Sequence, residues 1–271
     1  IKCFKEAIEI QEDLETMSHL ATAYTQVNQM EEAKAVWTRM TELDAENPIH
    51  FLSLANHCYM SEDYQGMEEA CKKAIGLNEQ IPVAYYLSAK AAIGQHNVIQ
   101  AIAMLTKAIM LKDDYAEAYQ LRAEVLWSMR QAKDAMEDIN KLLEMNEEDE
   151  SAILLKAEII AVSEDAEKAM ELINQVLAMN PFNEKAYLLK GNLLLAQKET
   201  DQAIAVYDEA LELNPNFAKA YHERGRAKLA KGDKESSMED MKKAIELAPE
   251  NGTSISGQYN NYDHLTRNVP F

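Results

Sequence analysis

The apolar and polar residues of this chain follow the period of amphipathic helices, and no segment alternates as a β-strand would. In residues 184–217, Tyr187 and Leu194 mark the apolar face of a first helix. Tyr207 lies on the apolar face of a second helix in the same segment. Pro215 closes the segment, because proline cannot continue a helix and the residue before it avoids the helical region.

The same pattern returns every 34 residues without insertion or deletion. The frames begin at Leu14, Pro48, Pro82, Ala116, Glu150, Glu184 and Ala218. The eighth position is always small: Ala21, Ala55, Ala89, Ala123, Ala157, Gly191 and Gly225. The twentieth position is small in all frames but one: Ala33, Met67, Ala101, Ala135, Ala169, Ala203 and Ser237. The fourth position is bulky: Met17, Phe51, Tyr85, Tyr119, Ile153, Tyr187 and Tyr221. Small residues at fixed places predict that paired helices approach closely.

These marks resemble the tetratricopeptide repeat family, whose unit is a 34-residue helix-turn-helix with bulky, small and proline positions at these offsets. The resemblance covers residues 14–251. It implies an all-α fold, a right-handed superhelical solenoid of helix-turn-helix repeats. We therefore expect seven antiparallel helix pairs, with left-handed residues such as Asn28 and Gly232 in the turns between paired helices.

The ends of the chain depart from the full repeat. Residues 1–11 look like the second helix of a repeat that lacks its first helix, so the predicted solenoid covers residues 1–251. Residues 252–271 lose alanine and gain asparagine, tyrosine and glycine. Because solenoids cover their end repeats, we predict that this tail is a degenerate cap. The rival prediction is that it binds the groove of a neighbouring molecule.

The last repeat also contains two charged residues at positions that are usually apolar. Lys228 stands at position 11 and Arg224 at position 7. Position 27, where alanine is usual in the family, holds Met40, Leu142 and Val176 in three frames. These departures predict loose packing of the end repeat without changing the predicted fold.

Composition limits the kinds of partner that the protein could bind and indicates its cellular location. A net charge of −19 argues against nucleic-acid binding, which needs a basic surface. No apolar run is long enough to span a membrane. Cys58 and Cys71 occupy core positions, which predicts buried free thiols and favours a reducing, cytoplasmic location. Export stays open, because the chain begins at Ile1 within a repeat and an upstream signal could be missing.

No pattern in the sequence predicts catalysis, a cofactor or a metal. The histidines are scattered, and neither HExxH, CxxC with histidine, GxSxG nor a phosphate-binding glycine loop is present. The acidic run Glu147 to Glu150 lacks the spacing of a calcium loop and is predicted to be a solvated turn. We therefore predict a non-enzymatic protein.

The family resemblance implies that first helices line a concave groove. Among the positions that would face it, the candidate partner-binding residues are Asn56, Tyr59, Tyr86, Lys90, Gln120, Glu124, Trp127, Lys185, Asn192, Lys219, His222 and Arg226. The aromatic residues of this set are expected to be partly exposed binding hot spots, with packing between first helices as the alternative. The basic residues near the C-terminal end form a possible anion-receiving patch, with simple solvation of a charged surface as the alternative.

The predicted function is a protein–protein interaction scaffold that holds a peptide or partner protein in the groove. One alternative is the adaptor part of a larger protein with an upstream enzymatic or anchoring module. Another is an assembly protein that self-associates through its repeat ends, and the oligomeric state is left open. The two-carboxylate clamp that some family members use for chaperone tails is disfavoured, because Leu52 and Leu188 stand where it needs lysine.

Overall fold

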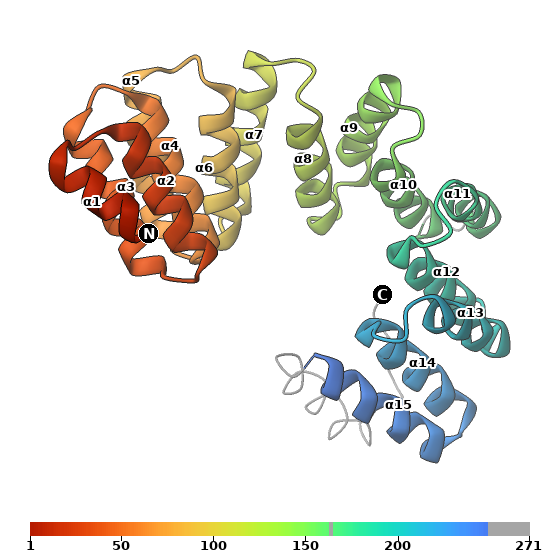
Figure 1. Ribbon diagram of the computed structural model, residues 1–271. Helices are drawn as coiled ribbons and strands as arrows, with labels where there is room; N and C mark the ends of the chain where they lie inside the picture. The colour runs from red at the N-terminus through yellow and green to blue at the C-terminus, as the bar shows by residue number, and fades with distance from the viewer. Residues whose placement is uncertain (163–164, 249–271) are drawn as a thin grey trace. The chain divides into compact units, whose positions relative to one another are not determined.

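The computed structural model describes residues 1–162 and 165–248 of the chain. The chain forms two compact units, which we call unit 1 (residues 1–147) and unit 2 (residues 148–271). The described residues of both units contain α-helices and no strand, so the predicted all-α repeat fold is confirmed (Figure 1). The superhelical hand stays a prediction, and the predicted cap at 252–271 lies outside the described residues.

The helix pairs follow the 34-residue frames. Unit 1 contains α1 (Lys2–Ile10), α2 (Leu14–Gln26), α3 (Met30–Leu43), α4 (Pro48–Met60), α5 (Tyr64–Leu77), α6 (Pro82–Gly94), α7 (Val98–Leu111), α8 (Ala116–Ser128) and α9 (Ala132–Met145). Unit 2 contains α10 (Glu150–Val162), α11 (Ala166–Met179), α12 (Glu184–Ala196), α13 (Thr200–Leu213), α14 (Ala218–Lys231) and α15 (Lys234–Leu247). Every first helix begins at its predicted frame start, and α1 is the predicted second helix without a partner.

In the described turns inside the repeats, the chain reverses through a left-handed residue. The predicted sites Asn28 (φ 60°) and Gly232 (φ 94°) are confirmed. The same conformation occurs at Glu62, His96, Arg130 and Lys198, which the sequence did not single out. The next amide returns to a carbonyl five residues earlier, as in Asp63 N–H to Cys58 O at 2.8 Å. This bond satisfies a helix-end carbonyl and offsets the cost of positive φ at a non-glycine residue.

Starts of the first helices are fixed by local chemistry. Asp13, Asn47 and Asn183 each accept an amide hydrogen bond from the first turn of the helix that follows. Asp149, within the acidic run that was predicted to be solvated, accepts the amide N–H of Ala152 at 2.9 Å. That residue is therefore a helix cap rather than a free carboxylate.

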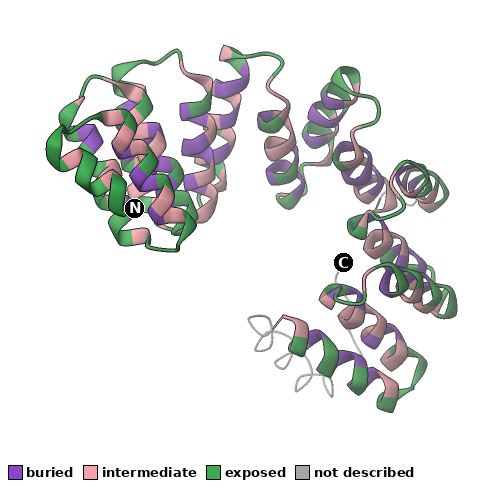
Figure 2. Ribbon diagram, in the orientation of Figure 1, coloured by how far each residue is buried: buried purple, intermediate pink, exposed green. Residues whose placement is uncertain are grey.

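Buried residues lie between the paired helices, where the small residues allow close approach (Figure 2). The alanines at positions 8 and 20 are fully buried, as in Ala123 and Ala135 of α8 and α9. Gly191 of α12 is required by its neighbour, since a Cβ there would lie 2.3 Å from Cε1 of the fully buried Tyr207. Glycine at position 8 therefore makes room for a larger residue at position 24.

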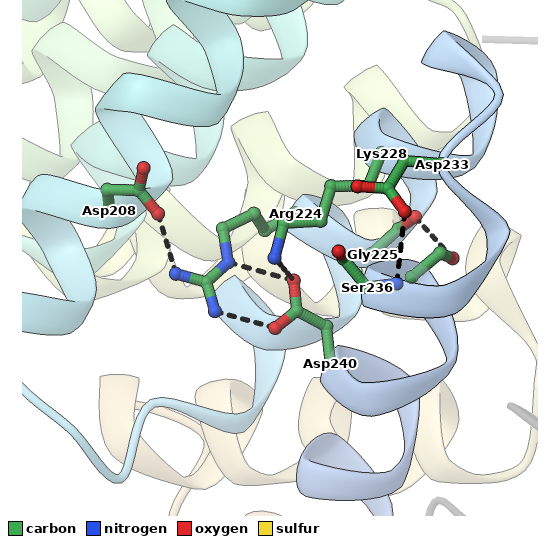
Figure 3. Close-up of polar contacts among 8 residues, drawn as sticks. Asp208, Arg224, Gly225, Lys228, Asp233, Ser236 and Asp240 are labelled. Atoms are coloured by element: carbon green, nitrogen blue, oxygen red, sulfur yellow. Dashed lines mark hydrogen bonds and ion pairs between the residues drawn. The ribbon is translucent and has the colours of Figure 1, made fainter.

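The last repeat does not pack loosely as the sequence suggested. Asp240 of α15 is buried and accepts two hydrogen bonds from Arg224, through Nε at 2.8 Å and Nη2 at 2.6 Å (Figure 3). Lys228 Nζ lies 2.8 Å from the same carboxylate. The two residues that depart from the apolar pattern thus share one buried acid. Met40, Leu142 and Val176 at position 27 are also buried.

Candidate functional site

The predicted groove residues fall into two groups, one in each unit. In unit 1 the first helix α4 contacts α6, and in unit 2 α10 contacts α12, which contacts α14. Neighbouring first helices therefore bring their side chains together within a unit. Asn56 to Trp127 of the predicted set lie in unit 1, and Lys185 to Arg226 lie in unit 2. We describe the two groups separately.

In unit 1, Lys90 of α6 places its ammonium over aromatic rings from two successive first helices. Its Nζ lies 3.6 Å from the ring centroid of Tyr59 on α4 and 5.8 Å from that of Tyr86 on α6. Among the described residues, Lys90 makes no ion pair with a carboxylate. Tyr59 remains 40% exposed. We call Tyr59, Tyr86 and Lys90 the aromatic–lysine cluster, a partly exposed site with a positive charge held in place by cation–π contact.

Tyr115 extends this cluster, although sequence reasoning missed it. It lies in the turn before α8, and its ring centroid is 5.4 Å from that of Tyr86. Burial, followed by the nearby Glu117 carboxylate, raises the pKa of Tyr86, and the same two causes raise the pKa of Tyr115 to about 12. Both phenols therefore stay neutral at physiological pH and can donate a hydrogen bond.

Trp127 does not have the partial exposure that the sequence predicted. Its side chain is only 9% exposed, within the packed part of α8, and the Arg130 guanidinium lies 5.1 Å from its ring centroid. The end of α8 buries three consecutive residues, Val125, Leu126 and Trp127, so burial here extends around the helix beyond the single face that the helical period marks. Trp127 is a packing residue in this structure.

The remaining predicted residues of unit 1 are polar and accessible to different degrees. Asn56 and Glu124 are exposed, whereas Gln120 is partly buried. Gln120 Nε2 donates to Glu124 Oε1 at 2.7 Å, and the buried Oε1 of Gln120 has no hydrogen-bond partner among the described residues. A buried acceptor without a partner is costly, so the orientation of the Gln120 side chain carries an energetic penalty.

In unit 2, the predicted basic patch contains an acid at its centre. Glu223 Oε1 lies 3.0 Å from His222 Nδ1, and its Oε2 accepts from Arg226 Nη1 at 2.7 Å. Burial acts to raise the pKa of Glu223, but the His222 hydrogen bond and the Arg226 charge together hold it below the ordinary value. Glu223 thus stays ionised and offsets one of the patch's positive charges, an effect that the separate residue positions did not reveal.

The exposed members of the patch are lysines from successive first helices. Lys185 on α12 and Lys219 on α14 are both exposed, and Asn192 is exposed as well. Asn192 Oδ1 accepts the hydroxyl of Tyr207 at 2.9 Å, so its amide is oriented by the core. Lys185 and Lys219 are therefore the residues best placed to meet an anion.

Two of the three cysteines are part of the packed core, whereas Cys3 is an exposed free thiol. Cys58 and Cys71 are buried free thiols, as predicted, and burial raises their pKa values to about 11 and about 12. Such thiols are weak nucleophiles at neutral pH. Within residues 1–162 and 165–248, no group of three or more His, Cys, Asp and Glu side chains could hold a metal ion. No helix in that part of the chain is long and apolar enough to cross a membrane.

Family models match the C-terminal half of the chain. Models described as TPR repeat and tetratricopeptide repeat match residues 191–232 and 218–251. A model described as anaphase-promoting complex, cyclosome, subunit 3 matches residues 128–210. The matches agree with the structure, in which the helix pairs of both units repeat every 34 residues. The chain is a tetratricopeptide repeat protein.

Solved structures share the fold of this tetratricopeptide repeat protein. The crystal structure of a tetratricopeptide repeat protein from Parabacteroides merdae is 17% identical, with a TM-score of 0.78, and the match covers 90% of this chain and 96% of that one. Cut9–Hcn1, an APC/C hetero-tetramer, gives 14% identity and a TM-score of 0.67. That match covers 94% of this chain and 50% of the other. Comparison with curated proteins gave no match.

The fold sets the general class of function. Tetratricopeptide repeats are protein–protein interaction scaffolds in general, and the helical surfaces of both units offer side chains for that purpose. Partner and binding mode are not fixed by the fold, because the fold is shared among proteins that bind different partners.

Proposed function

We propose that this tetratricopeptide repeat protein is a non-enzymatic scaffold that binds a segment of a partner protein across the first helices of unit 1. The observation that carries the proposal is the aromatic–lysine cluster. Lys90 is held over Tyr59 at 3.6 Å with no carboxylate partner among the described residues, and Tyr59 is 40% exposed. Exposed tyrosine beside a fixed charge is typical of binding hot spots.

The chemistry of the cluster indicates what the segment offers. A carboxylate of the partner would pair with the Lys90 ammonium, and an adjacent apolar side chain would pack on the Tyr59 ring. Because Lys90 is already oriented by two rings, less side-chain freedom is lost on binding than for a free lysine.

Charge reversal at Lys90 tests the proposal without touching the core. We expect Lys90→Glu to remove a defined set of partners from affinity capture with native extract, and to weaken an identified partner peptide at least about tenfold. Lys73→Glu on α5 is the matched control, since Lys73 is an exposed lysine on a second helix of the same unit. If both variants retain the same partners with unchanged affinity, the first-helix surface of unit 1 is not the binding site.

A second candidate is the binding of an acidic segment to unit 2. It is favoured by the two exposed lysines, Lys185 and Lys219, at the same position of successive repeats. Lys185→Glu/Lys219→Glu should abolish binding of an acidic peptide and remove its salt dependence. Lys242→Glu on α15 is the control. Equal binding by both variants would eliminate the patch as a site.

Two further questions are whether the chain is part of a larger adaptor protein and whether it self-associates. An adaptor role within a larger protein and self-association through repeat ends both remain proposals. Light scattering across a range of protein concentrations separates the second from the first, because self-association raises the apparent mass with concentration.

A further inference from the structure

Unit 2 contains a pocket outside the first-helix surface that carries the proposed function. It has a volume of about 240 Å³ and lies where the end of α13 meets the start of α12 and the turns that precede α12 and α14. The residues that matter in its lining are Phe182, Glu184, Tyr187, Leu213, Asn214 and Phe217. Small-molecule and cofactor sites are usually about 300–1,000 Å³, so this pocket suits a single large side chain.

Phe182 is exposed at a place where the other repeats are polar. It lies two residues before a first helix, and its side chain is 71% exposed. The residues at the same place before the other first helices are Glu12, Glu46, Gln80, Asp114, Glu148 and Asn216. The turn is held by the backbone, since the Phe182 amide donates to Asn180 Oδ1 at 3.1 Å, a bond that any residue except proline could make. The fold therefore does not require an aromatic ring here.

A comparison of two successive repeats explains the polar side of the pocket. In the repeat that begins at Glu150, the Glu150 Oε2 accepts from Asn180 Nδ2 at 2.9 Å and from Asn183 Nδ2 at 2.6 Å. In the next repeat, Glu184 Oε1 accepts from Asn214 Nδ2 at 2.6 Å. The residue equivalent to Asn183 is Phe217.

Replacement of an amide by Phe217 has two effects on the pocket. It adds an apolar wall, because Phe217 is 7% exposed and packs with Leu211 and Ala220. It also removes one hydrogen-bond donor from the carboxylate of Glu184, whose Oε2 has no hydrogen bond among the described residues. Glu184 therefore presents an incompletely paired negative charge beside an aromatic pocket.

The surroundings of the pocket favour a positively charged occupant. Glu209 and Glu212 on α13 are both exposed, and Glu209 is close enough to Tyr187 to contribute to raising the pKa of that phenol, after burial. Glu184 lines the pocket and Glu209 acts on Tyr187, another lining residue, so two carboxylates influence the pocket. Electrostatic complementarity selects against acidic peptides at such a site.

We propose that this pocket, which we call the Phe182 pocket, docks one large apolar side chain of a partner peptide that carries a lysine or arginine next to it. The apolar side chain enters between Phe182, Tyr187 and Phe217. The neighbouring cation pairs with Glu184. The surface is separate from the aromatic–lysine cluster of unit 1, so this inference does not depend on the proposed function.

The test selects peptides from a displayed random heptapeptide library on the full chain and measures their affinities. Phe182→Asn removes the ring and inserts the residue that stands at the same place before α14, so the turn is expected to fold normally. Glu184→Gln removes the charge and keeps an acceptor for Asn214. Ile99→Gln on α7 is the matched control, because Ile99 is another exposed apolar residue, 74% exposed, in unit 1.

The expected result is a set of peptides with a large apolar residue beside lysine or arginine. Phe182→Asn should weaken the binding of these peptides at least about tenfold. Glu184→Gln should also weaken binding and should remove its dependence on salt concentration. Ile99→Gln and Lys90→Glu should leave the affinity unchanged. The proposal is overturned if no such motif is enriched, or if the selected peptides bind Phe182→Asn as tightly as the parent chain. It is also overturned if the parent chain forms a dimer that Phe182→Asn dissociates, since a second copy would then be the occupant.

Discussion

In the described residues of each unit, an arginine pairs with a buried aspartate at the same repeat positions, but the two pairs have different surroundings. In unit 1, Arg122 on α8 donates to Asp138 on α9 through Nε at 2.8 Å and Nη2 at 2.6 Å, and its Nη1 donates to the neutral Thr106 at 3.0 Å. In unit 2, Arg224 makes the same bidentate contact with Asp240, while its Nη1 donates to the Asp208 carboxylate at 2.6 Å.

A lysine marks the other difference between the pairs. The Asp240 carboxylate also binds Lys228, whereas the equivalent position in unit 1 is the buried Leu126. The comparison teaches that a lysine can replace a core leucine when a buried carboxylate is already present to receive it. Asp240 would therefore keep a cation, Lys228, if Arg224 were removed. Asp138 has no second cation among the described residues.

The largest effect should follow from removal of the arginine in unit 1. Arg122→Met leaves the Asp138 side chain, which is 5% exposed, without a cation, and we expect a loss of about 3–5 kcal/mol in local stability. Arg224→Met should cost less, because Lys228 stays beside Asp240. Amide hydrogen exchange in α8–α9 and α14–α15 measures each repeat separately, which global unfolding of a repeat protein does not. Equal losses, or a larger loss in unit 2, would contradict the comparison.

Position 8 gives effects of intermediate size in both units. Ala123→Leu in unit 1 and Gly191→Ala in unit 2 both overpack a closed helix contact, and each should cost about 1–3 kcal/mol. Tyr207→Leu should relieve part of the cost of Gly191→Ala, because it removes the ring that a Cβ would meet. Chemical denaturation followed by circular dichroism measures these changes.

Gly76→Ala is the control with the opposite sign. Nothing lies within 4 Å of a Cβ at this position in α5, so the substitution should stabilise the helix by about 0.5–1 kcal/mol. Destabilisation by Gly76→Ala would mean that the close contact at Gly191 is not what distinguishes the two sites.

A smaller effect is expected when unit 2 is made to resemble unit 1. Lys228→Leu alone should change stability by less than about 1.5 kcal/mol, because Asp240 keeps its bidentate contact with Arg224. In that background, Arg224→Met should become as costly as Arg122→Met. A double-mutant cycle gives the coupling energy of Arg224 and Lys228. A coupling energy of zero would show that Lys228 does not act as the reserve cation.

The smallest expected effect is on the pH dependence of stability, where a histidine in unit 1 differs from one in unit 2. His222 in unit 2 contacts Glu223, whereas His57 in unit 1 is 3% exposed and neither ring nitrogen makes a hydrogen bond among the described residues. Burial, reinforced by Lys34, lowers the pKa of His57, partly opposed by the Met30 backbone and Glu31. The unfolded chain therefore binds more protons than the folded chain below about pH 6.5.

The sign of the pH effect follows from that difference. The stability that His57 provides as a neutral residue is complete above about pH 6.5 and falls as the pH decreases below that value. Unfolding measured at several pH values between about 5 and 7 should show a steeper loss for the parent chain than for His57→Leu. Parallel pH profiles would mean that His57 does not titrate with unfolding.

Local sequence features predicted the helical repeats well, because each of them acts over short distances. Helical period, small residues at position 8 and proline or asparagine at the turns specify where helices begin, end and meet. For the same reason the frame starts from Leu14 to Ala218 were predicted correctly, and so was the left-handed turn at Gly232. The other left-handed residues, such as Glu62, could not be predicted, since their conformation depends on a hydrogen-bonded turn rather than on the residue type.

The candidate site was predicted only in part. Sequence and family resemblance placed Tyr59, Tyr86 and Lys90 on first helices, and the structure brings these three together. They also placed Trp127 on the groove face, where the structure instead buries it. A helical period of 3.6 residues gives the face of a helix to within a broad angle, so it cannot tell a residue at the edge of the core from one at the edge of the groove.

The sequence by itself determined the repeat length, the helix boundaries and the acidic, cysteine-poor character of this tetratricopeptide repeat protein. Only the tertiary structure decided which polar residues became partners, such as Arg122 with Asp138 and Arg224 with Asp240, which lie 16 residues apart on different helices. It alone also formed the Phe182 pocket from two successive turns and the helices between them. The physical reason is that helix formation depends on neighbours along the chain, whereas burial and charge pairing depend on neighbours in space.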